Sequence, residues 1–176
     1  LLEAQGRSNL TIKDRSTVSR ILFSGKQAIG VEILTESGGV VVIHAGEVIL
    51  SSGSINSPAI LLRSGIGPQD DLRRLGIECV NDLQGVGSNL IDHSLAVVAA
   101  YPNPGIVNDS DDDVQMVIHY TAPGSAFKND MQIYCLGKLG AERFPGADPT
   151  RGLMFGTGIV INRPESRGRV TLDSAD

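Results

Sequence analysis

The sequence predicts a mixed α/β (α+β) fold made of two consecutive parts. Over residues 9–50, short β-branched and apolar runs alternate with turns, which is typical of strands. Helical patterns follow over residues 57–76, and strand-like runs return after residue 93. Apolar residues make up 41% of the 176 residues, which is enough for a sizeable core. We therefore expect a domain boundary near residue 93, with 1–93 and 94–176 as the two parts.

Strands are predicted throughout the first fifty residues. The run "NLTIKD" (9–14) alternates apolar and polar residues, and "TVSRILF" (17–23) is rich in β-branched and apolar ones. The turn "SGK" leads to a second run, "AIGVEIL" (28–34), and the turn "ESGG" leads to "VVVIHAGEVILSS" (40–52). We divide this last run near Gly46. Its second half, "EVILSS" (47–52), contains an unbroken apolar run, which is typical of a strand covered on both faces.

Two short helices are predicted next. In "GSINSPAILLRSGIG" (53–67), Ser57 suits an N-cap, Pro58 suits the first helical position, and Gly65 suits the position that ends a helix. The stretch "PQDDLRRLG" (68–76) has two aspartates in its first turn and two arginines in its last, which complement the helix dipole. The buried strand before the first helix would end in a turn with free backbone N–H groups, which favours an anion. Ordinary strand-to-helix connectivity is the alternative.

The second part of the chain is predicted to be mostly strands. After the glycine-punctuated loop at 84–93, four strand-like runs are separated by polar loops rich in proline and glycine. These runs are "LAVVAAY", "VQMVIHY", "MQIYCLG" and "GLMFGTGIVI". The final stretch, "RPESRGRVTLDSAD" (163–176), is interpreted as a turn followed by a short strand, "RVTL".

Glycine-rich phosphate-binding motifs are incomplete in this chain. Three Gly-x-Gly pairs could each begin a GxGxxG dinucleotide fingerprint, but the third glycine is replaced each time, by Asp70, Leu90 and Ile161. No GxxxxGK[ST] motif is present. The chain is therefore not expected to hold a dinucleotide unaided.

The histidines and the acidic run give no metal site. None of the histidines has a spacing that suggests metal ligands. A general-base role for His93 or His119 stays open beside a structural role. The run "NDSDDD" (108–113) lacks the glycine and the closing glutamate of an EF-hand, so it is expected to be a solvated loop.

Charge and hydropathy exclude several classes of partner. The net charge is −5 and no Lys/Arg block occurs, so nucleic acid is not expected as a partner. No apolar run approaches the length of about 18 residues that a membrane span needs. The start, "LLEAQGRSNL", has neither Met nor a signal-peptide pattern and is expected to lie inside a longer chain. Cys79 and Cys135 belong to no CxxC motif and are expected to be buried thiols, with a disulfide or a reactive thiol as the alternative. This usage fits a reducing, cytoplasmic compartment.

Several stretches together resemble one enzyme family. The stretch 53–67 resembles the second signature of the glucose–methanol–choline (GMC) oxidoreductases: a small residue pair, Ser-Pro, two aliphatic residues, then Ser-Gly-aliphatic-Gly. Residues 9–34 are similar to the family's strands upstream of that signature. The stretch "LQGVGSNLIDH" (83–93) resembles the family's Leu-Pro-Gly-Val-Gly-x-Asn-Leu-x-Asp-His segment, with Gln84 where proline is usual. Residues 163–168 resemble its Arg-Pro-x-Ser-Arg-Gly stretch, and the likeness is weakest over about 100–150.

The resemblance implies a flavoenzyme that oxidises a small-molecule alcohol by passing hydride to FAD. It implies that residues 1–93 are the later portion of a Rossmann-like FAD-binding domain. Residues 94–176 would then be the opening portion of a substrate-binding domain, a sheet backed by helices.

The resemblance also implies cofactor-binding residues. In the family, the backbone of a valine contacts the adenine end of FAD, and Val18 matches that valine. The turn before the signature places Ser52 and Gly53 close to the cofactor. Neighbours of the flavin site are expected in the Asn-Leu-x-Asp-His segment, at Asn89, Asp92 and His93. The family's GxGxxG and its catalytic histidine with its partner match nothing here, so no catalytic residue is assigned.

Other functions remain open at this point. The family also contains FAD-bearing lyases that cleave cyanohydrins. The chain by itself could be a catalytically silent binding or structural module. A piece of two domains would leave apolar sheet surface uncovered, so self-association is expected.

Overall fold

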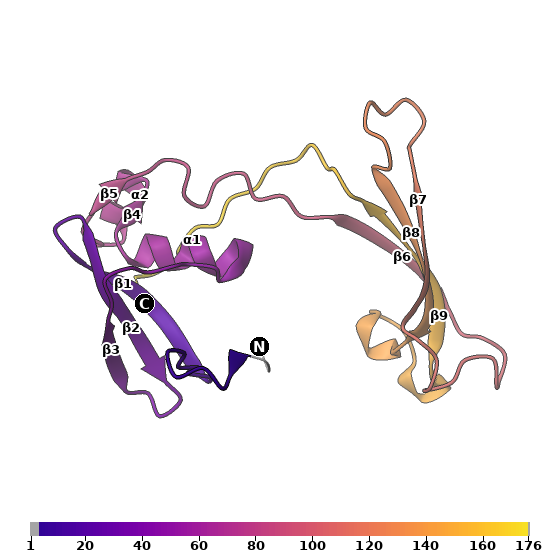
Figure 1. Cartoon of the computed structure of the whole chain (residues 1–176). Helices are drawn as coiled ribbons and strands as arrows, with labels where there is room; N and C mark the ends of the chain where they lie inside the picture. The colour runs from indigo at the N-terminus through magenta and orange to yellow at the C-terminus, as the bar shows by residue number, and fades with distance from the viewer. Residues whose placement is uncertain (1–3, 176) are drawn as a thin grey trace. The chain divides into compact units, whose positions relative to one another are not determined.

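The computed structural model describes residues 4–175, which form two compact units (Figure 1). One unit runs to Leu90 and also contains the segment from Arg167 onward, and the other spans Ile91–Ser166. This differs from the sequence-based division, which placed that final segment in the second part. The reason is backbone pairing: Leu90 and Gly168 form an antiparallel bridge, and the Val170 N–H donates to the Gly87 carbonyl at 2.7 Å. The predicted strand "RVTL" is wrong, since beyond this bridge the segment joins no sheet.

The first unit contains an antiparallel three-stranded sheet in the order β1-β2-β3. Its strands are β1 (Ser16–Ser24), β2 (Gln27–Thr35) and β3 (Val40–His44), as predicted from their β-branched runs. The strands predicted at 9–14 and 47–52 are wrong. Neither stretch lies beside another strand within residues 4–175, and a strand requires a neighbour for its backbone hydrogen bonds. Ile49 is consequently 84% exposed.

Helix α1 (Gly53–Arg63) starts earlier than the sequence analysis predicted. Ser52 is its N-cap, so Ser57 is not the cap and Pro58 lies inside the helix. Ser57 nevertheless stabilises the start, because its hydroxyl accepts the Ser52 N–H at 2.9 Å. The predicted end is confirmed: Gly65 follows the C-cap with φ +81°, a conformation that favours glycine.

The C-terminal end of α1 is joined to β1. The buried Ser64 hydroxyl accepts the Ile21 N–H at 2.8 Å and itself donates to the Ile60 carbonyl. Arg63 Nε donates to the Ser19 carbonyl at 2.8 Å, at an irregularity in the β1–β2 register. These bonds fix the helix against the sheet. The buried apolar side chains of this unit are Ile21, Ile33, Ile60, Leu62 and Leu72.

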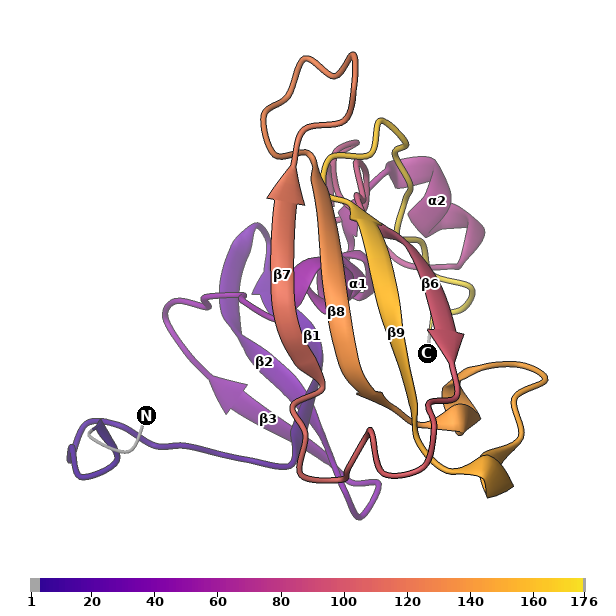
Figure 2. The ribbon, with the colours of Figure 1, turned by 90° about the vertical axis from the view of Figure 1, so that its right-hand side faces the viewer.

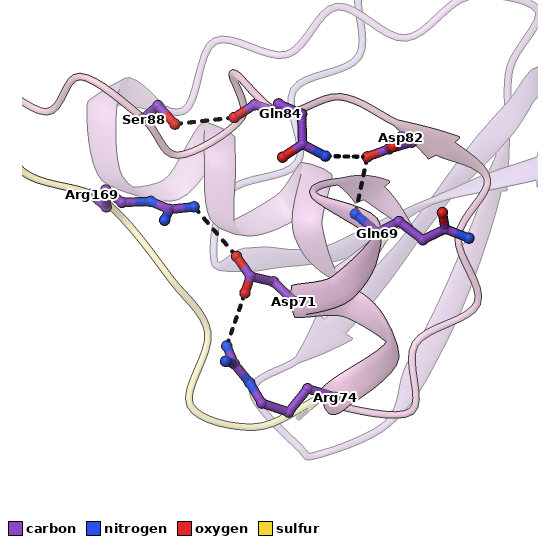
Figure 3. A network of polar contacts seen from close by, with 7 residues as sticks. All are labelled: Gln69, Asp71, Arg74, Asp82, Gln84, Ser88 and Arg169. Atoms are coloured by element: carbon purple, nitrogen blue, oxygen red, sulfur yellow. Dashed lines mark hydrogen bonds and ion pairs between the residues drawn. The ribbon is translucent and has the colours of Figure 1, made fainter.

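A small βαβ element follows α1. Strands β4 (Ile66–Gly67) and β5 (Asn81–Asp82) are parallel, and the predicted second helix, α2 (Gln69–Arg74), connects them. Asp82 accepts the Gln69 N–H at 3.0 Å and the Gln84 amide at 2.6 Å, so it caps the helix start (Figure 3). Gln84, the departure from the family pattern, therefore helps to orient this cap.

The second unit is a four-stranded antiparallel sheet in the order β6-β9-β8-β7 (Figure 2). The four predicted runs form these strands, which are β6 (Ser94–Ala100), β7 (Val114–Tyr120), β8 (Met131–Leu139) and β9 (Met154–Ile161). Two short 3-10 helices, η2 (Ala141–Arg143) and η3 (Pro149–Arg151), lie between β8 and β9. Leu139, Ala141 and Met154 form the core of this unit.

Candidate functional site

The turn before α1 exposes backbone at a helix start. Ser52 and Gly53 are both exposed, and Gly53 has φ +83° with open space where a Cβ would be. The Ser52 side chain makes no capping hydrogen bond, and the first turn of α1 contains no acidic residue. The first N–H groups of the helix and its dipole therefore favour an anionic or hydrogen-bond-accepting group here. This geometry fits the cofactor-binding role that the resemblance implies for these two residues.

Val18 lies on an edge strand of the same unit. It is half-buried on β1 and pairs with Ile33 of β2. Since the sheet order is β1-β2-β3, the other edge of β1 pairs with no strand in the part of the chain that the structure describes. Backbone groups of β1 form hydrogen bonds outside the sheet: the Ser19 carbonyl accepts from Arg63 Nε, and the Ile21 N–H donates to the Ser64 hydroxyl. A backbone contact from this strand to a ligand is therefore compatible with the fold.

The predicted residues of the Asn-Leu-x-Asp-His segment fall in different units. Asn89 precedes Leu90 in the first unit, whereas Asp92 and His93 belong to the second. Asn89 has φ +60°, which asparagine adopts more readily than most residues, so its identity also has a structural reason. The Asp92 carboxylate accepts the His93 N–H at 2.8 Å, and both residues are exposed. The structure thus divides the six predicted residues between two units.

The second sheet carries a polar group that was not predicted from the sequence. Gln132 Nε2 lies 3.3 Å from His119 Nδ1, and the Tyr134 hydroxyl donates to Gln132 Oε1. Of these three residues, only His119 is a candidate from the sequence. The period-two pattern of the run "MQIYCLG" places the two residues on one face of a strand and could have revealed them.

Two further features bear on function. Within residues 4–175, no His, Cys, Asp and Glu side chains gather in a group that could hold a metal ion. In the same part of the chain, every helix is too short or too polar to cross a membrane.

Comparison with known proteins identifies relatives of the first half most clearly. The family model described as "GMC oxidoreductase" matches residues 1–95. An oxygen-dependent choline dehydrogenase from Pseudomonas aeruginosa (strain LESB58) is 54% identical over 93 residues, 52% of this chain and 17% of that protein. An uncharacterised GMC-type oxidoreductase from Rhodococcus erythropolis is 33% identical across 100% of this chain and 34% of its own length. The chain thus spans about a third of that relative.

Solved structures agree with this result. Pyridoxine 4-oxidase from Mesorbium loti matches with a TM-score of 0.80 and 30% identity, over 99% of this chain and 34% of its own. The formate oxidase of Aspergillus oryzae RIB40, studied for its FAD modification, matches with a TM-score of 0.81, over 98% of this chain and 39% of its own. Its 22% identity supports the fold alone. The match to the GMC oxidoreductase family model supports FAD as the cofactor expected from the sequence.

Proposed function

This chain belongs to the GMC oxidoreductase family, and from that premise we propose that the protein containing it is an FAD-dependent oxidoreductase acting on the CH–OH group of an alcohol. The observation that carries the proposal is the signature stretch 53–67, whose first part forms helix α1 (Gly53–Arg63) directly after an exposed turn in which Ser52 makes no side-chain capping bond. When bound, FAD accepts hydride from the substrate. The alcohol is a small molecule, as the choline dehydrogenase relatives suggest.

We assign the residues of this chain to binding and positioning. The turn at Ser52 and Gly53 contacts the cofactor through backbone N–H groups, and Val18 contacts its adenine end through the β1 backbone. Asn89, Asp92 and His93 are neighbours of the flavin site. The first unit is accordingly the later portion of the FAD-binding domain, and the second unit belongs to the substrate-binding domain.

The cofactor site is tested by paired glycine variants. Gly53→Ala and Gly25→Ala both place a Cβ at positive φ, at +83° and +59°, where the structure offers open space. Their cost in backbone strain is therefore similar. We expect Gly53→Ala to lower the FAD content of the purified protein, measured by flavin absorbance, while Gly25→Ala leaves it unchanged. Equal FAD content in the two variants would exclude the assignment of this turn.

The reaction is tested on the same protein. Anaerobic addition of choline or benzyl alcohol is expected to bleach the flavin absorbance, because reduced flavin absorbs less visible light. If the flavin stays oxidised with a broad panel of alcohols, yet the protein cleaves a cyanohydrin, the lyase hypothesis would be favoured instead. A protein that binds no flavin would favour a silent module.

We further propose that the apolar surface of this chain is covered by association, either with itself or with the rest of the protein. Exposed apolar side chains support this proposal, including Ile49 at 84% and Val98 at 72% exposed. Size-exclusion chromatography of the 176-residue chain tests it, and a sharp monomer peak would contradict it. The sequence predicted Cys79 and Cys135 to be buried, whereas in the structure both are free and only partly buried. A cytoplasmic location, inferred from the sparse cysteines of the sequence, stays a prediction.

A further inference from the structure

The loop that ends the first unit holds Asn89 in a left-handed backbone conformation. Its φ of +60° costs free energy for residues other than glycine, although less for asparagine than for most. The side chain is exposed, and it forms no hydrogen bond with any residue from 4 to 175. Glycine would adopt the same conformation at lower cost, so the conformation alone does not explain why an amide is present here.

The final segment of the unit holds the backbone on both sides of Asn89. On one side, the Gly87 carbonyl accepts the Val170 N–H at 2.7 Å. On the other side, the Leu90 N–H donates to the Gly168 carbonyl at 3.0 Å, and the Gly168 N–H donates to the Leu90 carbonyl at 2.8 Å. Gly87 is buried, and a Cβ there would lie 2.2 Å from the Val170 carbonyl oxygen. The two backbones are therefore in direct contact, and we call the segment Gly168–Val170 the clamp.

The same loop is also attached to the start of α2. The Ser88 hydroxyl donates to the Gln84 carbonyl at 3.1 Å, and the Gln84 side chain donates to Asp82 at 2.6 Å (Figure 3). Asp82 in turn accepts the Gln69 N–H of α2. The loop is thus fixed before any ligand binds, and binding does not have to restrict its backbone.

The chemistry of the asparagine side chain limits what it can bind. Its amide offers two N–H donors and a carbonyl acceptor, and it carries no charge. No residue from Gln84 to Leu90 is charged. A neutral polar group therefore suits Asn89 better than a phosphate. The hydroxyls of the ribityl chain and the N–H and carbonyl groups of the isoalloxazine ring are the groups of this kind in FAD.

We propose that the Asn89 amide forms a hydrogen bond with a neutral polar group of FAD, and that the clamp positions it. This rests on the proposed function and specifies how one of its binding residues works. Gly168 and Val170 act through the backbone of Gly87 and Leu90, so they are positioning residues and do not touch the cofactor. The final segment, far away in the sequence, thereby contributes to cofactor binding.

Matched asparagine variants separate the amide from the backbone conformation. Asn89→Gly removes the amide and keeps a residue that favours positive φ, and the control Asn129→Gly makes the same change at φ +56° in the second unit. The flavin-free protein is titrated with FAD, and quenching of flavin fluorescence gives the Kd. We expect Asn89→Gly to raise Kd roughly two- to tenfold, the loss of one hydrogen bond, and Asn129→Gly to leave Kd unchanged. Equal Kd values in the two variants would overturn the proposal.

A double-mutant cycle tests the clamp. Gly87→Ala drives a Cβ against Val170, whereas the control Gly85→Ala meets nothing within 4 Å. We expect Gly87→Ala to weaken FAD binding and Gly85→Ala to leave it unchanged. If the clamp acts through Asn89, adding Asn89→Gly to Gly87→Ala raises Kd little further. Fully additive effects would show that the clamp does not position Asn89.

The outcomes for the clamp and for the proposed function are distinguishable. If Gly87→Ala does not fold, the asparagine variants alone decide. An unmodified protein that binds no FAD would refute the proposed function together with this inference. If FAD binds and Asn89→Gly binds it equally well, only this inference fails. If Asn89→Gly weakens FAD binding but no alcohol bleaches the flavin of the unmodified protein, the proposed reaction fails while the role of Asn89 stands.

Discussion

Arg169 forms an ion pair with Asp71 at 3.4 Å, joining residues 98 positions apart in the sequence. Asp71 also pairs with Arg74 at 3.1 Å, so the final segment is attached to α2 by a shared carboxylate (Figure 3). The same residues border a small pocket, which is also lined by the apolar side chains of Val170, Leu172, Leu62, Leu72 and Val86. The segment is therefore held by backbone bridges, by charge and by apolar contact.

The apolar contact is expected to matter more than the ion pair. Arg169→Ala removes an exposed pair and should lower the free energy of unfolding by about 0.5 kcal/mol. Leu172→Ala removes half-buried apolar surface and should cost about 1–2 kcal/mol. Urea denaturation of both variants measures the difference. A larger loss in Arg169→Ala would show that charge dominates this attachment.

Gly87 is expected to tolerate no side chain. A Cβ there would lie 2.2 Å from the Val170 carbonyl oxygen, and its φ of +78° is itself unfavourable for other residues. Gly87→Ala should therefore lower the free energy of unfolding by more than about 1 kcal/mol. It should also detach the final segment from the loop, so that proteases cleave the segment faster. The control is Gly85→Ala, where a Cβ meets nothing within 4 Å. Similar protease resistance in both variants would contradict the packing described for this loop.

Ser64 is expected to be important for joining α1 to β1. Its side chain accepts the Ile21 N–H, and the residue is only 6% exposed. Ser64→Ala leaves that buried N–H without a partner, which should cost about 1–3 kcal/mol. Ser88→Ala removes a more exposed bond to the Gln84 carbonyl and should change stability by less than about 0.5 kcal/mol. Thermal unfolding followed by circular dichroism compares them, and equal midpoints would argue against the role of Ser64.

Asp130 is expected to make stability depend on acid pH. Hydrogen bonds from the Ala122 N–H and the Ser125 side chain hold the pKa of Asp130 below its ordinary value of 3.8. The folded state therefore binds this proton less readily than the unfolded state, so the stabilisation is present above that value and is lost as pH falls through the lowered folded-state pKa. Asp130→Asn should be less stable than the unmodified protein at neutral pH, with a gap that narrows at acid pH.

The acid titration has a direct control. Asp112→Asn removes one exposed carboxylate of the second unit and serves as the matched control for the change of charge. Urea midpoints measured across the acid range compare the three proteins. A gap for Asp130→Asn that is constant with pH would show that the carboxylate charge is not the stabilising feature.

Local sequence was sufficient to predict most regular elements. The β-branched runs predicted β1, β2 and the four strands of the second sheet, because a strand of period two is encoded within its own residues. The charge pattern of α2 and the glycine that ends α1 were likewise local signals. The predicted start of α1 was wrong because the Ser57-Pro58 pair is a common helix beginning. Here both residues lie inside the helix, and the Ser57 hydroxyl accepts the N–H of the N-cap residue, Ser52.

The sequence by itself determined the family, through a signature whose spacing is matched between Gly53 and Gly67. Tertiary structure alone decided three other features. The stretch 47–52 forms no strand, because a strand exists only with a neighbour. The final segment joined the first unit, because Gly87 and Leu90 offered it backbone partners. His119, Gln132 and Tyr134 became one row, because register between strands, which no local pattern encodes, places them side by side.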